Sequence, residues 1–279
     1  MVDRSSRIKL SAGQVFWSEA GDAHRPVLIF LHGSWHDRSQ WQQIVEPLSK
    51  IFHCFALDLL GFGNSIAIET PTSIAMEVDC LHEFLTALKL RTVYLVGHSL
   101  GAWIAVSYTL KYPNLVRGVV AISPEGYSLP NFQQYGRGTK WLLSQPWLFR
   151  LWLNSLQTIS SIGDRADPLA KSQAYWNYYH QFPTTCRLFF QRSTKEIRNE
   201  LVADRLVQLR LPFLVLQGDS TDRSKVEQGQ SYAKAVRKSE YRLISGAASQ
   251  GSDLQIVREI QAFVDRVQTK IDREEVELW

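Results

Sequence analysis

The sequence feature that most constrains the fold is the pentapeptide Gly-His-Ser-Leu-Gly at residues 97–101. It follows a short apolar run, residues 93–96, and opens a stretch with helical periodicity, residues 100–111. A serine between two glycines at such a strand-to-helix turn takes a strained backbone conformation, and the glycines remove side chains that would collide there. The pattern predicts that Ser99 is a nucleophile for carbonyl carbon and that the Leu100 amide faces the oxyanion.

Short apolar runs and amphipathic helices alternate along much of the chain. The apolar runs are nearly continuous, which is typical of strands buried on both faces of a parallel sheet. A hairpin is expected first, over residues 7–21, with its turn near Gly13. The predicted strands are then 27–31, 52–57, 93–96, 116–122, 213–216 and 241–244, and the predicted helices are 73–90, 100–111, 224–237 and 253–267. This alternation predicts an α/β protein with a parallel sheet.

A histidine–glycine pair ends the predicted strand that precedes a tryptophan-rich loop. Gly33 lets the chain turn so that the Ser34 amide can face the nucleophile, which predicts the second donor of an oxyanion hole. His32 is expected to brace this loop by hydrogen bonding. Asp58 ends the next strand, before a glycine-rich turn, and is expected to be a structural turn carboxylate.

Composition and charge limit the class of protein. The chain has 279 residues, of which 45% are hydrophobic and 21% charged, as in an ordinary globular protein. Its net charge of +4 is spread along the sequence, which argues against nucleic-acid binding. The three cysteines have no paired spacing, and neither a signal peptide nor an apolar run of about 18 residues is present. We therefore expect a cytoplasmic protein.

The sequence carries no motif for metal or nucleotide chemistry. The segment around His82 lacks the second histidine of a zinc-binding helix, and no phosphate-binding glycine loop follows a predicted strand. The sequence thus predicts no metal and no nucleotide cofactor.

Residues 126–198 interrupt the alternation, because they contain aromatic-rich helical stretches and no convincing strand. We expect a helical cap there, inserted into a core formed by residues 1–125 and 199–279. Trp141, Trp147, Phe149 and Trp152 recur at a spacing that fits one helical face. Such a face predicts either a cover for a cleft that binds a lipophilic acyl ligand, simple packing of the cap, or contact with a membrane surface.

The order of these motifs resembles the α/β-hydrolase fold superfamily over nearly the whole chain. The matching segments are His-Gly at 32–33, D-x-x-G-x-G-x-S at 58–65, GHSLG at 97–101, the helical insertion and "LPFLVLQGD" at 211–219. The resemblance is to the capped branch that includes esterases, dehalogenases and epoxide hydrolases. It implies an eight-stranded, mostly parallel sheet with the cap after the sixth strand, and a nucleophile, acid and histidine in that chain order. Serine as the nucleophile implies ester, thioester or similar acyl chemistry.

Three carboxylates are candidates for the acid of the triad. Most members of the family carry it shortly after the seventh strand, where this chain has Asp219 and Asp222. Other members carry it just after the sixth strand, where Glu125 stands. The sequence leaves these three alternatives open.

The histidine expected after the eighth strand is absent. The segment "LISGAASQGSDL" at residues 243–254 places Ser249 at that position, and no histidine follows His180. A hydroxyl cannot replace imidazole as a base near neutral pH. The candidates for a substitute are His36, in the loop after the first parallel strand, then His180 in the cap and His98 beside the nucleophile.

Two functions follow from these observations. In the first, the chain is a serine hydrolase for an ester or other acyl substrate that is lipophilic, with an unorthodox base. In the second, it is a catalytically degenerate relative that binds a lipophilic ligand or a protein partner in the former active-site cleft.

Overall fold

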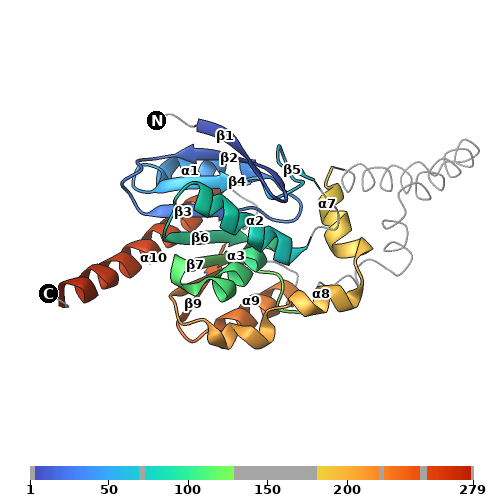
Figure 1. Cartoon of the computed structure of the whole chain (residues 1–279). Coiled ribbons are helices and arrows are strands. Elements are labelled where there is room, and N and C mark those ends of the chain that lie inside the picture. The colour runs from blue at the N-terminus through green and yellow to red at the C-terminus, as the bar shows by residue number, and fades with distance from the viewer. Residues whose placement is uncertain (1–3, 69–72, 129–180, 220–222, 246–249, 278–279) are drawn as a thin grey trace, which may run out of the picture. The chain divides into compact units, whose positions relative to one another are not determined.

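The computed structural model of the chain describes residues 4–68, 73–128, 181–219, 223–245 and 250–277 (Figure 1). Two compact units are present, one formed by residues 1–129 with 200–279 and the other by residues 130–199. Most of the predicted helical cap, including Trp141 to Trp152, lies outside the described residues. The cap and its aromatic face therefore stay predictions.

A mostly parallel sheet forms the centre of the larger unit (Figure 1). Its strand order is β1-β2-β4-β3-β6-β7-β8-β9, and the two-residue β5 pairs with β2. Only the pairs of β2 with β1, β4 and β5 are antiparallel among the described strands. The strands are β1 (Arg4–Leu10), β2 (Gly13–Ala20), β3 (Val27–Leu31), β4 (His53–Leu57), β5 (Ile66–Ala67), β6 (Val93–His98), β7 (Val116–Ile122), β8 (Phe213–Gly218) and β9 (Ser239–Ile244). The predicted α/β class and parallel sheet are confirmed, and β5 is an addition to the eight strands expected.

Helices of the larger unit cover both faces of the sheet. On one face, α1 and α10 pack together over buried strand residues such as Leu28, Phe30 and Val96. Because successive side chains of a strand point to opposite faces, Ile29 and Leu31 are buried on the other face, that of α2 and α3. The helices are α1 (Gln42–Leu48), α2 (Ile74–Ala87), α3 (Leu100–Lys111), α9 (Arg223–Ala235) and α10 (Gln250–Glu277), with 3-10 turns η1 (Arg38–Trp41), η2 (Pro113–Leu115) and η5 (Ala203–Gln208).

The smaller unit is described only at its end, where α7 (Pro183–Cys186), a π-helical turn η4 (Arg187–Gln191) and α8 (Thr194–Glu200) follow one another. The start of α8 is a capping box, since Ser193 Oγ accepts from the Glu196 amide and the Glu196 carboxylate accepts from the Ser193 amide. No helix within the described residues is both long and apolar enough to cross a lipid bilayer.

The helix α1 was not predicted from the sequence, and α10 was predicted too short. Only Ile44 and Leu48 of α1 are buried, and Pro47 lies inside it, so its apolar pattern is too brief to recognise. The helix α10 continues to Glu277, past the predicted end at residue 267.

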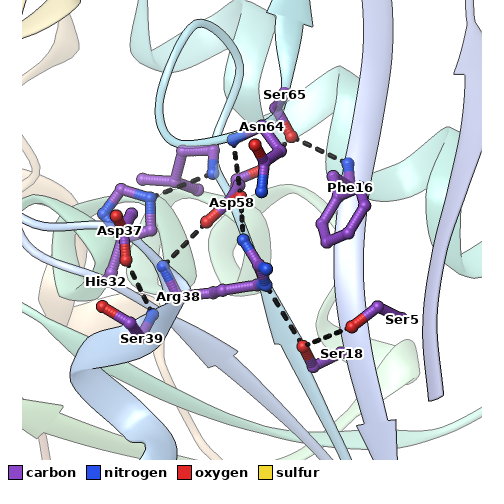
Figure 2. A network of polar contacts seen from close by, with 11 residues as sticks. Ser5, Phe16, Ser18, His32, Asp37, Arg38, Ser39, Asp58, Asn64 and Ser65 are labelled. Carbon is purple, nitrogen blue, oxygen red and sulfur yellow. Dashed lines mark hydrogen bonds and ion pairs between the residues drawn. The ribbon is translucent and has the colours of Figure 1, made fainter.

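A buried ion pair joins the loops that follow β3 and β4 (Figure 2). The fully buried Asp58 carboxylate accepts from the Arg38 amide at 2.8 Å, from Arg38 Nη1 at 2.7 Å and from the Asn64 amide at 2.8 Å. The Arg38 guanidinium also lies 4.3 Å from the Phe16 ring centroid. Asp58 is therefore a structural carboxylate, as predicted, because buried charges persist only when they are paired and hydrogen-bonded.

We predict that Asp58→Asn lowers the free energy of unfolding by about 3 kcal/mol, because the amide nitrogen would face one or two of the three donors and the arginine would lose its counter-ion. Urea denaturation measures this loss. Asp79→Asn is the matched control, since Asp79 pairs with Lys111 at the surface and its removal should cost less than about 1 kcal/mol. Equal losses in the two variants would contradict this account of the network.

A second buried carboxyl, Glu77 of α2, should make stability depend on pH. Its Oε2 accepts from the Leu60 amide at 3.3 Å, while its Oε1 is buried without a hydrogen-bond partner. Burial raises the pKa of Glu77 to about 8, so the folded protein keeps a proton that the unfolded chain releases near pH ~4.3. This contribution to stability is complete at low pH and is lost as the pH rises towards about 8.

The free energy of unfolding of Glu77→Gln should accordingly exceed that of the unmodified chain by roughly 2–4 kcal/mol at pH ~7, with the difference vanishing near pH ~4. Denaturant titrations at several pH values measure it. A difference that does not change with pH would show that Glu77 is ionised in the fold.

Candidate active site

Ser99 occupies a strained turn between β6 and α3. Its φ of 51° and ψ of −111° lie where residues with a side chain rarely occur. Glycine is required on both sides, because a Cβ on Gly97 would lie 2.5 Å from the Ala102 nitrogen and one on Gly101 would lie 2.1 Å from the Leu31 oxygen. The turn is the one that the GHSLG pattern predicts, and it lies at the carboxyl end of β6.

The Ser99 hydroxyl is hydrogen-bonded directly to a carboxylate. Ser99 Oγ donates to Glu125 Oε1 at 2.7 Å, and Ser34 Oγ donates to Glu125 Oε2 at 3.4 Å. Of the three acid candidates, the structure thus brings Glu125 to the serine. Asp219 is exposed at the end of β8, and Asp222 lies outside the described residues.

The turn that carries Glu125 is fixed by backbone strain and by buried aromatic residues. Ser123 has a φ of 43° and Gly126 a φ of 87°, and a Cβ on Gly126 would lie 2.3 Å from the Trp103 ring. The buried Tyr232 hydroxyl donates to the Glu125 carbonyl oxygen at 2.6 Å. Sequence reasoning missed Trp103 and Tyr232, although Tyr232 stands in a helix that the periodicity predicted.

Opposing effects act on the Glu125 carboxyl. Burial raises the pKa of Glu125 above its ordinary value, while the hydrogen bond from Ser99, the positive charge of Lys225 and the hydrogen bond from Ser34 lower it. Burial is the largest of these effects. The carboxylate consequently holds a proton more readily than an exposed glutamate does.

The loop after β3 is tied at three points. His32 Nε2 accepts from the Leu59 amide at 3.0 Å, so Nδ1 carries the proton and donates to the Gly33 oxygen at 2.8 Å. Burial lowers the pKa of His32 to about 4, which keeps the ring neutral. The His32 carbonyl accepts from the Gly101 amide at 3.1 Å, and the Gly33 amide donates to Gln40 Oε1 at 3.0 Å. His32 therefore braces the loop, as predicted, and the oxyanion roles of the Ser34 and Leu100 amides stay predictions.

His36 and His98 lie together, with their ring centroids 6.0 Å apart. Gln40 Nε2 and His98 Nδ1 are 2.9 Å apart, and burial lowers the pKa of His98 to about 3. No hydrogen bond joins the His36 ring to Ser99 or Glu125 within the described residues. His180 and Ser249, the other positions considered for a base, are outside them.

The two histidines line a cavity of about 240 Å³ at the carboxyl ends of the central strands. Ile122, Gly218 and Ile244 contribute to its wall from β7, β8 and β9. In the part of the chain that the structure describes, no group of three His, Cys, Asp or Glu side chains could hold a metal ion.

Comparison with known proteins gives a family and a set of related structures. The model of the alpha/beta hydrolase fold family matches residues 26–248. A thermophilic esterase from Thermogutta terrifontis has a TM-score of 0.69 at 18% identity, over 95% of this chain and 99% of that one. A haloalkane dehalogenase from Bradyrhizobium elkani has a TM-score of 0.72 at 16% identity, over 96% of this chain and all of that one (100%). Likeness at this identity shows the fold alone.

Curated relatives match a shorter segment. The 1-acylglycerol-3-phosphate O-acyltransferase ABHD5 of Rattus norvegicus is 30% identical over 127 residues, which are 43% of this chain and 36% of that protein. A haloalkane dehalogenase of Bradyrhizobium diazoefficiens is 29% identical over 113 residues, 40% of this chain and 36% of that protein. The match therefore spans about a third of the length of these relatives.

The position of the loop after β3 can be tested through Gly33, because a Cβ there would lie 2.5 Å from His98 Nδ1. We predict that Gly33→Ala lowers the free energy of unfolding by about 1–3 kcal/mol in the unmodified chain. In a His98→Ala background the same change should cost clearly less, since the colliding ring is gone. A double-mutant cycle by denaturant titration measures the coupling. Additive losses would mean that the loop does not rest against His98.

Proposed function

The chain belongs to the alpha/beta hydrolase fold family, and we propose that it is a serine-type acyl hydrolase that cleaves an ester or other acyl substrate. One observation carries the proposal. Ser99 stands in a left-handed turn at the carboxyl end of β6 and the start of α3, with its hydroxyl hydrogen-bonded to a carboxylate at 2.7 Å. A strained residue of this kind persists only where the surrounding structure enforces it, and such residues cluster at functional sites.

In this proposal Ser99 Oγ attacks the acyl carbon and the Leu100 and Ser34 amides stabilise the oxyanion. Support comes from α3, since the first amides of a helix have no partner within it and its N-terminus favours negative charge. Further support comes from the loop after β3, whose ties to Leu59, Gly101 and Gln40 hold Ser34 close to Glu125. Donors fixed in advance cost no reorganisation during the reaction.

We propose a lipophilic acyl group as the substrate's reacting part. Two of the four compared proteins have names that support acyl chemistry, the acyltransferase and the esterase, while the other two are haloalkane dehalogenases. The aromatic residues of the predicted cap are the part of this chain that would contact such a group or a membrane surface. The cytoplasmic location that the sequence predicts stays part of this proposal, and all three cysteines are buried thiols.

A second candidate function is binding without turnover. It is favoured by Ser249, which stands where the family resemblance places the catalytic histidine. In that case the former active-site cleft that the family resemblance implies would hold a lipophilic ligand or a protein partner. Both candidates use the same residues, so only a chemical experiment separates them.

A fluorophosphonate probe provides this experiment, because it phosphonylates only an activated serine. We predict one label per chain at Ser99, located by peptide mass spectrometry, together with hydrolysis of p-nitrophenyl esters. Ser99→Ala should lose both, whereas Ser107→Ala, a matched change in the same helix, should keep both. An unmodified chain that is never labelled would refute the hydrolase proposal and leave the binding function.

A further inference from the structure

We infer that Glu125 is the general base of this site and takes the Ser99 proton directly, with no imidazole between them. The inference rests on the proposed function, because it needs Ser99 to act as the nucleophile. It assigns to Glu125 a role different from that of a triad acid, which orients and stabilises a histidine and does not itself accept the proton.

The Ser99 hydroxyl and the Glu125 carboxylate lie close enough for direct proton transfer. Ser99 Oγ and Glu125 Oε1 are 2.7 Å apart, which is the separation of a strong hydrogen bond from a hydroxyl to a charged carboxylate. A general base must lie within about 2.6–3.2 Å of the group whose proton it abstracts. An imidazole ring cannot fit between two oxygen atoms at this separation. Proton transfer between them therefore needs no third residue.

Glu125 is held in place by contacts from several directions. Its amide donates to the Ser99 carbonyl at 3.3 Å, and its own carbonyl accepts from Tyr232 of α9 at 2.6 Å. Ser123, two residues earlier, is strained at a φ of 43°, a conformation that needs support from its surroundings. A side chain that only filled space would not require such a turn.

The groups that face the carboxyl complete the site. Ser99 comes from the start of α3, Ser34 from the loop after β3, and both donate hydrogen bonds to it. Lys225 and Tyr232 of α9 are the charged and titratable groups that act on it. Burial raises the pKa of Glu125, which makes its carboxylate a stronger base than that of an exposed glutamate.

The proposed steps balance as follows. Ser99 Oγ forms a bond to the acyl carbon while its proton moves to Glu125, and the carbonyl oxygen becomes an oxyanion. The oxyanion collapses, the bond to the leaving alkoxide breaks, and Glu125 returns the proton to that alkoxide. A water molecule then attacks the acyl-enzyme and gives a proton to Glu125. The second collapse breaks the bond to Oγ, which recovers the proton, and a carboxylic acid is released.

The experiment is the pH dependence of the second-order rate constant for labelling of Ser99 by a fluorophosphonate. In the unmodified chain we expect the rate to fall about tenfold per pH unit below the pKa of Glu125, because only the carboxylate form can take the proton. Glu125→Gln keeps an oxygen that can accept from Ser99 but cannot accept a proton. The labelling rate of this variant should be at least about 10²-fold lower, and its pH profile should have no acid limb.

Glu46→Gln is the control, because it makes the same change at an exposed position of α1, and it should keep both the rate and the pH profile of the unmodified chain. Melting curves of each variant check folding.

A second variant tests whether the acid limb belongs to Glu125. Lys225→Met removes the positive charge that lowers the pKa of Glu125, so the acid limb should move to higher pH. A base on which Lys225 does not act would keep its limb, and a merely structural glutamate would not move it. The same charge lowers the pKa of His98, so a limb that belonged to His98 would shift too but would survive in Glu125→Gln.

The outcomes separate the two proposals. If Ser99 is labelled but Glu125→Gln reacts at the unmodified rate with the same acid limb, the inference is overturned and the hydrolase function stands. Loss of the acid limb in His36→Ala instead of Glu125→Gln would also overturn it and would identify His36 as the base. If Ser99 is not labelled at any pH, the hydrolase function and the inference both fail.

Discussion

The contact between the start of α3 and the end of β3 is the constraint on which the rest of the site depends. The Gly101 amide donates to the His32 carbonyl at 3.1 Å, and the backbone of Gly101 comes so close to Leu31 that a Cβ would lie 2.1 Å from its oxygen. This approach sets the angle between β6 and α3 and forces Ser99 to a φ of 51°. The same contact fixes the loop that carries Ser34. The close approach of Gly101 to Leu31, which only glycine allows, thus positions both Ser99 and the loop that carries Ser34.

Buried charge in this fold is arranged in three different ways. Asp58 is paired with Arg38 and ties two loops together (Figure 2). Glu77 has one oxygen without a partner, and burial raises its pKa to about 8, so it is neutral through much of the pH range. Both carboxylate oxygens of Glu125 accept a hydrogen bond from a serine hydroxyl, and one of these donors is the strained Ser99. A buried carboxylate that accepts a hydrogen bond from a nucleophile, and whose pKa is raised by burial, is the arrangement expected of a base.

The sequence predicted the regular elements well because their patterns are local. The helix α3 has the predicted bounds, and β3 and β7 do too, since apolar runs and the glycines at 97 and 101 mark their ends. It could not choose among Glu125, Asp219 and Asp222. The bond from Ser99 to Glu125 depends on the strain at Ser123, the ring of Trp103 and the hydroxyl of Tyr232, which lie far apart in the chain. Sequence spacing does not show which distant residues meet in the fold, whereas five consecutive residues are enough to predict the strand-to-helix turn at Ser99.

The direct bond between Ser99 and Glu125 is the central claim, and a carboxyl titration tests it most directly. In protein with ¹³C-labelled glutamate side chains, the Glu125 resonance is the one that disappears in Glu125→Gln. The account predicts that this resonance titrates above the ordinary range of glutamate and that Ser99→Ala raises its pKa further, because the hydrogen bond that favours the carboxylate is lost. An unchanged Glu125 titration in Ser99→Ala would mean that the two side chains do not share a proton, and it would contradict the account.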